Sequence, residues 1–366
     1  MPEYVKAFRK WLREGIEWRV PIIKERAARP MGFIHGRSGR LWRWLHFPFR
    51  WMLPYRRRRI EVFREGALGD VLMCTPGLRE LKRLNPHCHI TFHSQFGTLL
   101  RGLPYLDEVP EYHRESISPK VITFWYEDSL PPRRHLAEIM ADHLGVGITD
   151  TRPDCVVDDR LVDRFRENWA SLPRPWILVN RRSSGYTPNK DWFEERWDKL
   201  IQRLVTWGSV IEIGKKDLTD IERSPENHLD LRGRTTLDEL VASIAASDLL
   251  ISPISGPVHI AAAVDIPCVV IYGGYEKPTC SNYDGNVNIA VDMPCSPCFL
   301  NTPCPIDREC LKRISVAQVE AAVVRLWGQR TNIHDKVQDD MVGEGDQKLE
   351  ASISRTSIGS APENPE

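Results

Sequence analysis

The sequence lacks several features that would settle its class at once. No run approaches the ~20 consecutive apolar residues that a membrane-spanning helix requires. No secretory signal is expected either, because basic side chains interrupt the first apolar stretch, namely Lys6, Arg9, Lys10 and Arg13. The nine cysteines are mostly scattered, which is typical of a reducing compartment, and no solenoid-length repeat is present. These absences predict a cytoplasmic protein.

The charge of the chain is balanced overall but unevenly distributed. The 366 residues include 50 Lys and Arg and 50 Asp and Glu. Residues 1–59 hold 16 of the basic residues, four of the acidic ones and five of the 12 tryptophans. Aromatic rings beside cations are typical of a segment that lies on an anionic membrane surface. A helix packed on its own domain and a nucleic-acid arm are alternatives. No nucleic-acid-reading module accompanies the segment, so we expect no nucleic-acid partner.

Length and periodicity predict an α/β protein with two Rossmann-like domains. The first is expected over residues 60–172 and the second over 173–328, with a hinge at Pro173–Pro175. Predicted strands cover 60–64, 89–93, 121–125, 176–180, 209–214, 249–252 and 268–272. Predicted helices cover 71–84, 134–144, 193–207, 237–246 and 316–327. Residues 329–366 are polar and acid-biased and are expected to be disordered.

The stretch from Ser247 to Gly274 predicts one βαβ unit. Apolar strands flank a helix that begins with a hydroxyl residue, a glycine and a proline, a combination that favours helix initiation. Two strand ends and a helix N-terminus therefore meet, and their unpaired N–H groups favour an anion such as a diphosphate. Candidate binding residues from this unit are Ser255, Gly256, Pro257, Gly273 and Gly274.

Three stretches of the chain follow one known family in order and spacing. They read REGALGDVLMCTPGLRELKRLNP at 64–86, LRGRTTLDELVASIAASDLLISPISGPVHIAAA at 231–263 and PCSPCFLNTPCPIDRECLKRIS at 294–315. Together they resemble glycosyltransferase family 9, the lipopolysaccharide heptosyltransferase family. The resemblance implies a GT-B fold, in which two Rossmann-like domains face each other across a cleft. It also implies inverting sugar transfer from a nucleotide diphosphate sugar, with no cofactor or metal required for catalysis.

Inverting transfer needs a base for the acceptor hydroxyl and positive potential on the leaving diphosphate. Asp70 follows Gly69 at the predicted strand-to-helix turn and matches the family's proposed base. The alternative is that this carboxylate only caps the helix through backbone N–H groups.

The resemblance also assigns donor contacts. The residues are Lys190, Ser183, Ser184, Gly256, Pro257 and His259. Lys190 matches a lysine that meets the donor phosphates, and its alternative is an exposed cation at a helix entry. The two serines lie in the loop after strand 176–180, where their hydroxyls would reach the same phosphates. His259 belongs to the family's G-P-x-H turn, where the helix N-terminus supplies the field that a metal supplies in other glycosyltransferases.

Three features of the sequence depart from the family pattern. Pro253 and Ile254 replace an Asn-Asp pair before the turn, so a carboxylate that would bind donor hydroxyls is missing. We expect Ile254 to face the donor pocket. The first domain is short, and the basic segment 1–59 is an addition.

These features predict a peripheral glycosyltransferase on the inner face of the cytoplasmic membrane. Its acceptor would be the lipopolysaccharide core or another lipid-linked glycan. The alternative is a non-catalytic nucleotide-sugar-binding regulator or assembly factor, which Ile254 favours, whereas Asp70 and Lys190 favour the enzyme. A GT-B-fold sugar-nucleotide epimerase would leave the basic segment unexplained.

Four cysteines have the spacing C-x2-C-x5-C-x5-C. They are Cys295, Cys298, Cys304 and Cys310. Four thiolates at this spacing are compatible with a structural zinc site. Free or transiently oxidised thiols and stable disulfides are the alternatives.

Overall fold

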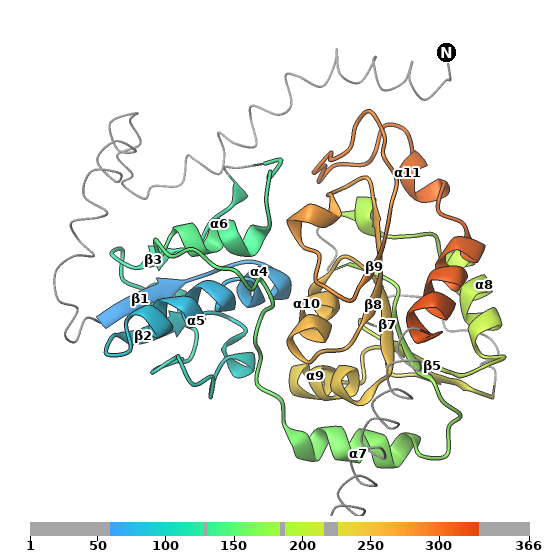
Figure 1. The fold of residues 1–366 in the computed structure, drawn as a ribbon, viewed down its shortest axis with the longest axis horizontal. Coiled ribbons are helices and arrows are strands. Elements are labelled where there is room, and N and C mark those ends of the chain that lie inside the picture. Colours follow the sequence, from blue (N-terminus) through green and yellow to red (C-terminus); the bar gives the residue numbers. More distant parts are fainter. Residues whose placement is uncertain (1–58, 128–129, 184–186, 216–225, 329–366) are drawn as a thin grey trace, which may run out of the picture.

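The computed structural model describes residues 59–127, 130–183, 187–215 and 226–328, which form two α/β units (Figure 1). Each unit is built on a parallel sheet, and this confirms the predicted fold class. The basic segment and the acidic tail lie outside the described residues, apart from Arg59. No helix in the described ranges is long and apolar enough to cross a membrane.

The first unit holds a three-stranded sheet in the order β2-β1-β3. The strands are β1 (Arg59–Phe63), β2 (His89–His93) and β3 (Ile122–Thr123). The helices are α4 (Leu68–Leu72), α5 (Thr75–Leu84) and α6 (Leu136–Asp142), with 3-10 turns at Gly97–Leu99 and Arg114–Ser116. In the register of the sheet, Phe63 of β1 pairs with His93 of β2 and with Thr123 of β3, so the carboxyl ends of all three strands lie together.

The single helix predicted over 71–84 is wrong, because the segment forms two helices, α4 and α5. Pro76 has no N–H to donate to the carbonyl of Leu72, so the helical hydrogen-bond ladder stops there. The hydroxyl of Thr75 donates to the Leu72 carbonyl at 2.7 Å instead. The first helix also begins earlier than predicted, so Asp70 lies inside its first turn.

The second unit holds a six-stranded parallel sheet in the order β6-β5-β4-β7-β8-β9. The strands are β4 (Trp176–Asn180), β5 (Ser209–Ile213), β6 (His228–Asp230), β7 (Leu249–Pro253), β8 (Cys268–Gly273) and β9 (Val287–Ala290). The helices are α7 (Asp159–Trp169), α8 (Glu194–Leu204), α9 (Leu237–Ala246), α10 (Gly256–Ala263) and α11 (Glu309–Lys312), with 3-10 turns at Pro188–Lys190 and Pro278–Cys280. The strand order reverses at β4, the point where ligands bind in open α/β sheets.

Alternate residues of the second sheet enter two separate apolar clusters. Ile177 and Val179 of β4 pack with the buried face of α8, whereas Leu178 packs with residues of α9 and α10. Residues 316–328 continue as a helix on the α8 side, as the sequence predicted for 316–327. The sequence analysis missed α7, which packs against α9 through Val162, Phe165 and Trp169.

The two units touch where α4 meets α10, as Figure 1 shows between the sheets. This approach depends on two glycines. A Cβ at Gly69 would lie 2.4 Å from Cδ2 of His259, and a Cβ at Gly256 would lie 2.9 Å from Cδ2 of Leu68. Any larger residue at either position would force the two helices apart.

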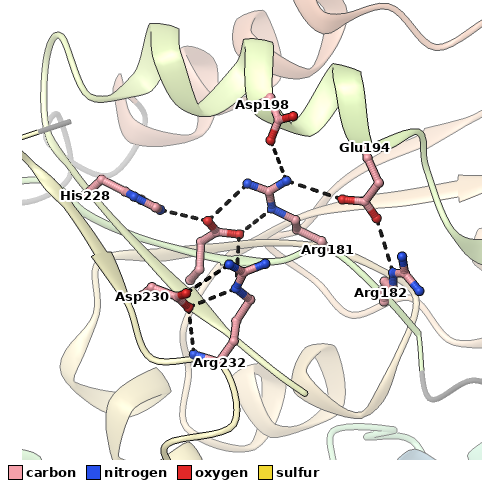
Figure 2. Close-up of polar contacts among 8 residues, drawn as sticks. Arg181, Arg182, Glu194, Asp198, His228, Asp230 and Arg232 are labelled. Atoms are coloured by element: carbon pink, nitrogen blue, oxygen red, sulfur yellow. Dashed lines mark hydrogen bonds and ion pairs between the residues drawn. The ribbon is translucent and has the colours of Figure 1, made fainter. Parts of the chain in front are cut away.

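A buried charge network joins the ends of β4, β5 and β6 to the first turns of α8 (Figure 2). Glu212 is 0% exposed, and it accepts hydrogen bonds from Arg181 and, at 2.8 Å, from His228. Arg181 also reaches Asp198 at 2.6 Å and Glu194 at 3.3 Å. Arg232 pairs with Asp230 at 2.9 Å, and its Nε lies 3.9 Å from Glu212. The network fixes the backbone from which the loop after β4 leaves the sheet.

Candidate active site

Asp70 lies in the first turn of α4 with its side chain 17% exposed, and α4 is the helix that touches α10. Its Oδ2 accepts the Ala67 N–H at 3.0 Å, so the capping role that the sequence offered as an alternative is present. The same oxygen lies 3.3 Å from Nη2 of Arg64, whereas Oδ1 accepts only the Tyr126 hydroxyl at 3.2 Å among the interactions found for it. Capping therefore occupies one oxygen and leaves the other for a second role.

Three residues around Asp70 were missed by the sequence analysis. Arg64 is buried directly after β1 and holds Glu127 at 2.9 Å as well as Asp70. Tyr126 and Glu127 follow β3, the neighbouring strand. Burial alone would lower the pKa of Arg64, but the charges of Asp70 and Glu127 raise it, so the guanidinium stays charged. Residues that follow neighbouring parallel strands lie together at one edge of the sheet, so their positions directly after predicted strands could have indicated them.

Lys190 lies in the short 3-10 turn Pro188–Lys190 and is already engaged within the second unit. Its Nζ donates to Glu276 at 3.0 Å and lies 4.5 Å from the ring centre of Tyr275. Glu276 is buried and also accepts the hydroxyl of Ser281. An ammonium has three N–H donors, so two remain for phosphate oxygens.

The predicted serine contacts divide into three cases. Ser183 donates both its N–H, at 2.7 Å, and its hydroxyl, at 2.8 Å, to Asp191. Ser184 lies outside the described residues. Ser255 precedes α10, accepts from the amide of Asn180 at 3.1 Å and donates to the Pro253 carbonyl. Ser183 and Ser255 therefore shape the two loops at this edge of the sheet.

Gly273 and Gly274 close β8 beneath the cysteine-containing stretch. Gly273 has φ = 59°, and a Cβ there would lie 2.6 Å from Cδ2 of Leu311. A Cβ at Gly274 would lie 3.2 Å from Cβ of Cys310. Packing accounts for both glycines, and their assignment as donor contacts stays a prediction.

His259 is buried in α10, two residues after Pro257, and its ring meets the first unit. Its Nδ1 shares a 2.6 Å hydrogen bond with the hydroxyl of Tyr283. His135, before α6, donates from Nε2 to the Asn282 carbonyl at 3.1 Å, and its ring also stands edge-on to Tyr283. Two histidines from different units are thus joined through one tyrosine.

Acid should weaken this histidine junction. Burial lowers the pKa of His259 to about 3 and that of His135 to about 4, below the ordinary value near 6.5. Between these lowered pKa values and pH 6.5, the unfolded chain binds more protons than the folded chain. The stability that the two neutral histidines contribute is therefore fully present above about pH 6.5 and is lost as the pH falls. When the pH is lowered from 7.5 to 5, each histidine should reduce the free energy of unfolding by about 2 kcal/mol, measured by urea unfolding. His135→Asn keeps a helix-capping side chain and should remove about half of that pH dependence; an unchanged dependence would contradict the assignment.

Charges from the second unit reach the neighbourhood of Asp70. Burial raises the pKa of Tyr126 well above its ordinary value, with contributions from Asp70, Glu127 and Glu276. The structure places Gly69, the residue before Asp70, against His259. Asp70 and His259 are residues that the sequence assigned to the base and to the donor turn.

Ile254 does not lie where the sequence predicted. It is 2% exposed and belongs to the apolar cluster that contains Val258 and Ile260. The strand pairing of β7 with β8 extends to this residue, since its N–H donates to the Ile271 carbonyl at 3.4 Å, and this turns the side chain inward. The expectation that it faces the donor is wrong.

The four spaced cysteines lie close together without forming a metal site. Burial and the three neighbouring cysteines raise the pKa of the Cys298 thiol to about 11. Across the described ranges, no three His, Cys, Asp or Glu side chains are arranged to hold a metal ion. All nine cysteines of the chain are described, and none of them forms a disulfide in this structure.

Comparisons with known proteins point to one family. Residues 134–306 match the family model described as glycosyltransferase family 9 (heptosyltransferase). The chain is 26% identical over 151 residues to the lipopolysaccharide core heptosyltransferase OpsX of Haemophilus influenzae, covering 38% of this chain and 41% of the relative. It spans about two fifths of the length of the first curated relatives it matches.

Two solved structures share the fold. A family 9 glycosyl transferase of Veillonella parvula aligns with a TM-score of 0.57 at 21% identity, over 75% of this chain and 98% of that one. The iron-containing dodecameric glycosyltransferase TibC of enterotoxigenic Escherichia coli aligns with a TM-score of 0.58 at 19% identity, over 76% and 78%. The predicted GT-B fold is confirmed. Residues 134–306, a little under half of the chain, are thus similar to glycosyltransferase family 9.

Proposed function

We propose that the chain is an inverting, metal-independent glycosyltransferase. It transfers a sugar from a nucleotide diphosphate sugar to the lipopolysaccharide core or another lipid-linked glycan. The observation that carries this proposal is the contact of α4 with α10: Gly69, beside the candidate base Asp70, packs on His259 of the G-P-x-H turn. Base and donor turn are therefore adjacent, as an in-line displacement requires.

The chemistry follows from these residues. Asp70 takes the proton of the acceptor hydroxyl, whose oxygen bonds to the anomeric carbon while the bond to the diphosphate breaks. The two remaining N–H groups of Lys190 and the N-terminus of α10 stabilise the charge that develops on the leaving diphosphate. The basic aromatic residues 1–59 bring the protein to the anionic inner face of the cytoplasmic membrane, where a lipid-linked acceptor lies.

A donor panel tests the proposal. We expect turnover of a nucleotide diphosphate sugar in the presence of a lipopolysaccharide-core acceptor. Steady-state rates across the panel are the measurement, and the absence of turnover with every donor would contradict the proposal.

Ile254→Asp, which would return a carboxylate to this position, is not a useful variant for the donor panel. Because Ile254 is buried in an apolar cluster, the substitution would bury an unpaired carboxylate and lower stability instead. The unmodified chain is therefore the protein to test.

A non-catalytic nucleotide-sugar-binding protein is the second candidate. Lys190 and Ser183 are both engaged by acidic partners within the second unit, which favours a structural role for them. Binding of donors, detected by thermal shift, without turnover of any would support this candidate.

A structural zinc at the four spaced cysteines stays a proposal, although the thiols of the described structure are not arranged as a ligand set. The neighbour TibC is described as iron-containing, so metal analysis should cover iron as well as zinc. Protein purified reduced and without chelator is the sample that decides it.

A further inference from the structure

The contacts of Asp70 leave an acceptor position open on Oδ1. A carboxylate offers about four lone pairs, two on each oxygen. Oδ2 accepts the Ala67 N–H at 3.0 Å and forms an ion pair with the Arg64 guanidinium at 3.3 Å. Oδ1 accepts the hydroxyl of Tyr126 at 3.2 Å. A substrate hydroxyl can therefore donate to Oδ1, beside the Tyr126 phenol and on the oxygen that Arg64 does not hold.

We propose that Tyr126 is a positioning residue for Asp70, and that it aims the remaining lone pair of Oδ1 at the acceptor hydroxyl. The proposal rests on the proposed function. In the step it serves, the acceptor O–H gives its proton to Oδ1 and the acceptor oxygen bonds to the anomeric carbon. The electrons of the broken anomeric bond leave with the nucleotide diphosphate. Tyr126 keeps its own proton throughout and acts only as a donor.

The phenol can fix Asp70 because Tyr126 is itself held on several sides. Its backbone N–H donates to Oε2 of Glu127 at 2.9 Å. Glu127 in turn is held by Arg64 at 2.9 Å, and the Arg64 guanidinium lies 5.1 Å from the centre of the Tyr126 ring. Arg64 also donates to the Phe124 carbonyl at 3.0 Å, which ties the segment after β3 to the end of β1. Carboxylate, phenol and guanidinium are therefore connected by hydrogen bonds and an ion pair, which restricts the orientation of Asp70.

The first unit contains a matched copy of this arrangement away from the candidate site. Tyr105 donates its hydroxyl to Asp154 at 2.8 Å, and Asp154 is also paired with Arg79 at 2.6 Å. The two sets share the same chemistry, a phenol and a guanidinium on one aspartate. Tyr105→Phe is therefore the control for Tyr126→Phe.

The experiment is steady-state kinetics of the full chain as a function of pH. In Tyr126→Phe we expect turnover to fall about 10- to 100-fold, the value of one hydrogen bond to a charged group. The KM for the donor should stay within about threefold, because the phenol donates to Asp70 and not to a residue assigned to the donor. The acid limb of the rate–pH profile should move up by about one pH unit, since a hydrogen bond donated to a carboxylate favours its ionised form. Tyr105→Phe should change none of the three.

Two results would overturn the proposal. One is wild-type turnover with an unmoved acid limb in Tyr126→Phe; the other is a loss of turnover that leaves the limb in place, which indicates a packing role alone. A double-mutant unfolding cycle of Tyr126→Phe with Asp70→Asn is independent of activity. Coupling between the two substitutions supports the contact, and additive effects reject it. A wild-type chain that shows coupling but transfers no sugar contradicts the proposed function rather than the contact.

Discussion

Replacing Asp70 with asparagine should lower turnover by about 10²- to 10⁴-fold, the usual contribution of a general base. Asparagine is nearly isosteric and its amide oxygen can still accept the Ala67 N–H, so α4 keeps its first turn. What it cannot do is take a proton from the acceptor hydroxyl. Donor affinity, measured separately by thermal shift or calorimetry, should stay within a few-fold, because the predicted donor contacts lie in the second unit.

The control for this substitution is Asp154→Asn, which also removes a carboxylate paired with an arginine and a tyrosine in the same unit. It should lower stability without a comparable effect on turnover. If Asp70→Asn retained wild-type turnover, Asp70 would be a helix cap and a partner of Arg64 alone. If both variants lost turnover equally, the loss would result from destabilisation of the first unit and not from missing proton transfer.

Replacing Glu212 with glutamine should lower the free energy of unfolding by about 3–5 kcal/mol, the range for breaking a buried ion pair by removing one partner. Glu212 is fully buried between Arg181, His228 and Arg232 in the network of Figure 2. An amide there offers one acceptor in place of a charged pair and leaves two buried guanidinium groups less compensated. Urea unfolding at neutral pH measures the change.

An exposed pair supplies the comparison. Glu80 and Arg83 lie one turn apart on α5, with Arg83 well exposed. Glu80→Gln should cost about 0.3–0.5 kcal/mol at most, because solvent screens such helix pairs. An equal effect of the two substitutions would mean that the Glu212 network adds no more to stability than a surface pair does.

The strands and the donor turn could be predicted because their signals are local. Apolar runs bounded by Gly and Pro located β2, β4, β7 and β8 to within about one residue, and the G-P-x-H string located the start of α10. The environment of Asp70 could not be predicted in the same way. Arg64 and Tyr126 are 62 residues apart in sequence, and only the pairing of β1 with β3 brings them together.

The prediction for Ile254 was wrong for a related reason. Its place between a strand and a helix indicated a loop residue that faces a ligand, but β7 continues through Pro253 and its pairing with β8 carries the side chain into the core. Sequence position identified the edge of the sheet correctly. The face of the sheet toward which Ile254 points depended on one additional residue of strand pairing. The sequence around Ile254 does not indicate that pairing.

The glycine contact between α4 and α10 has a mechanical consequence. The ring of His259 occupies the space beside Gly69, and the side chain of Leu68 occupies the space beside Gly256. The separation of the two units is therefore set by two side chains that each fit over a glycine of the opposite helix. A larger residue at either glycine would change the distance between Asp70 and His259 even though it removes neither of them.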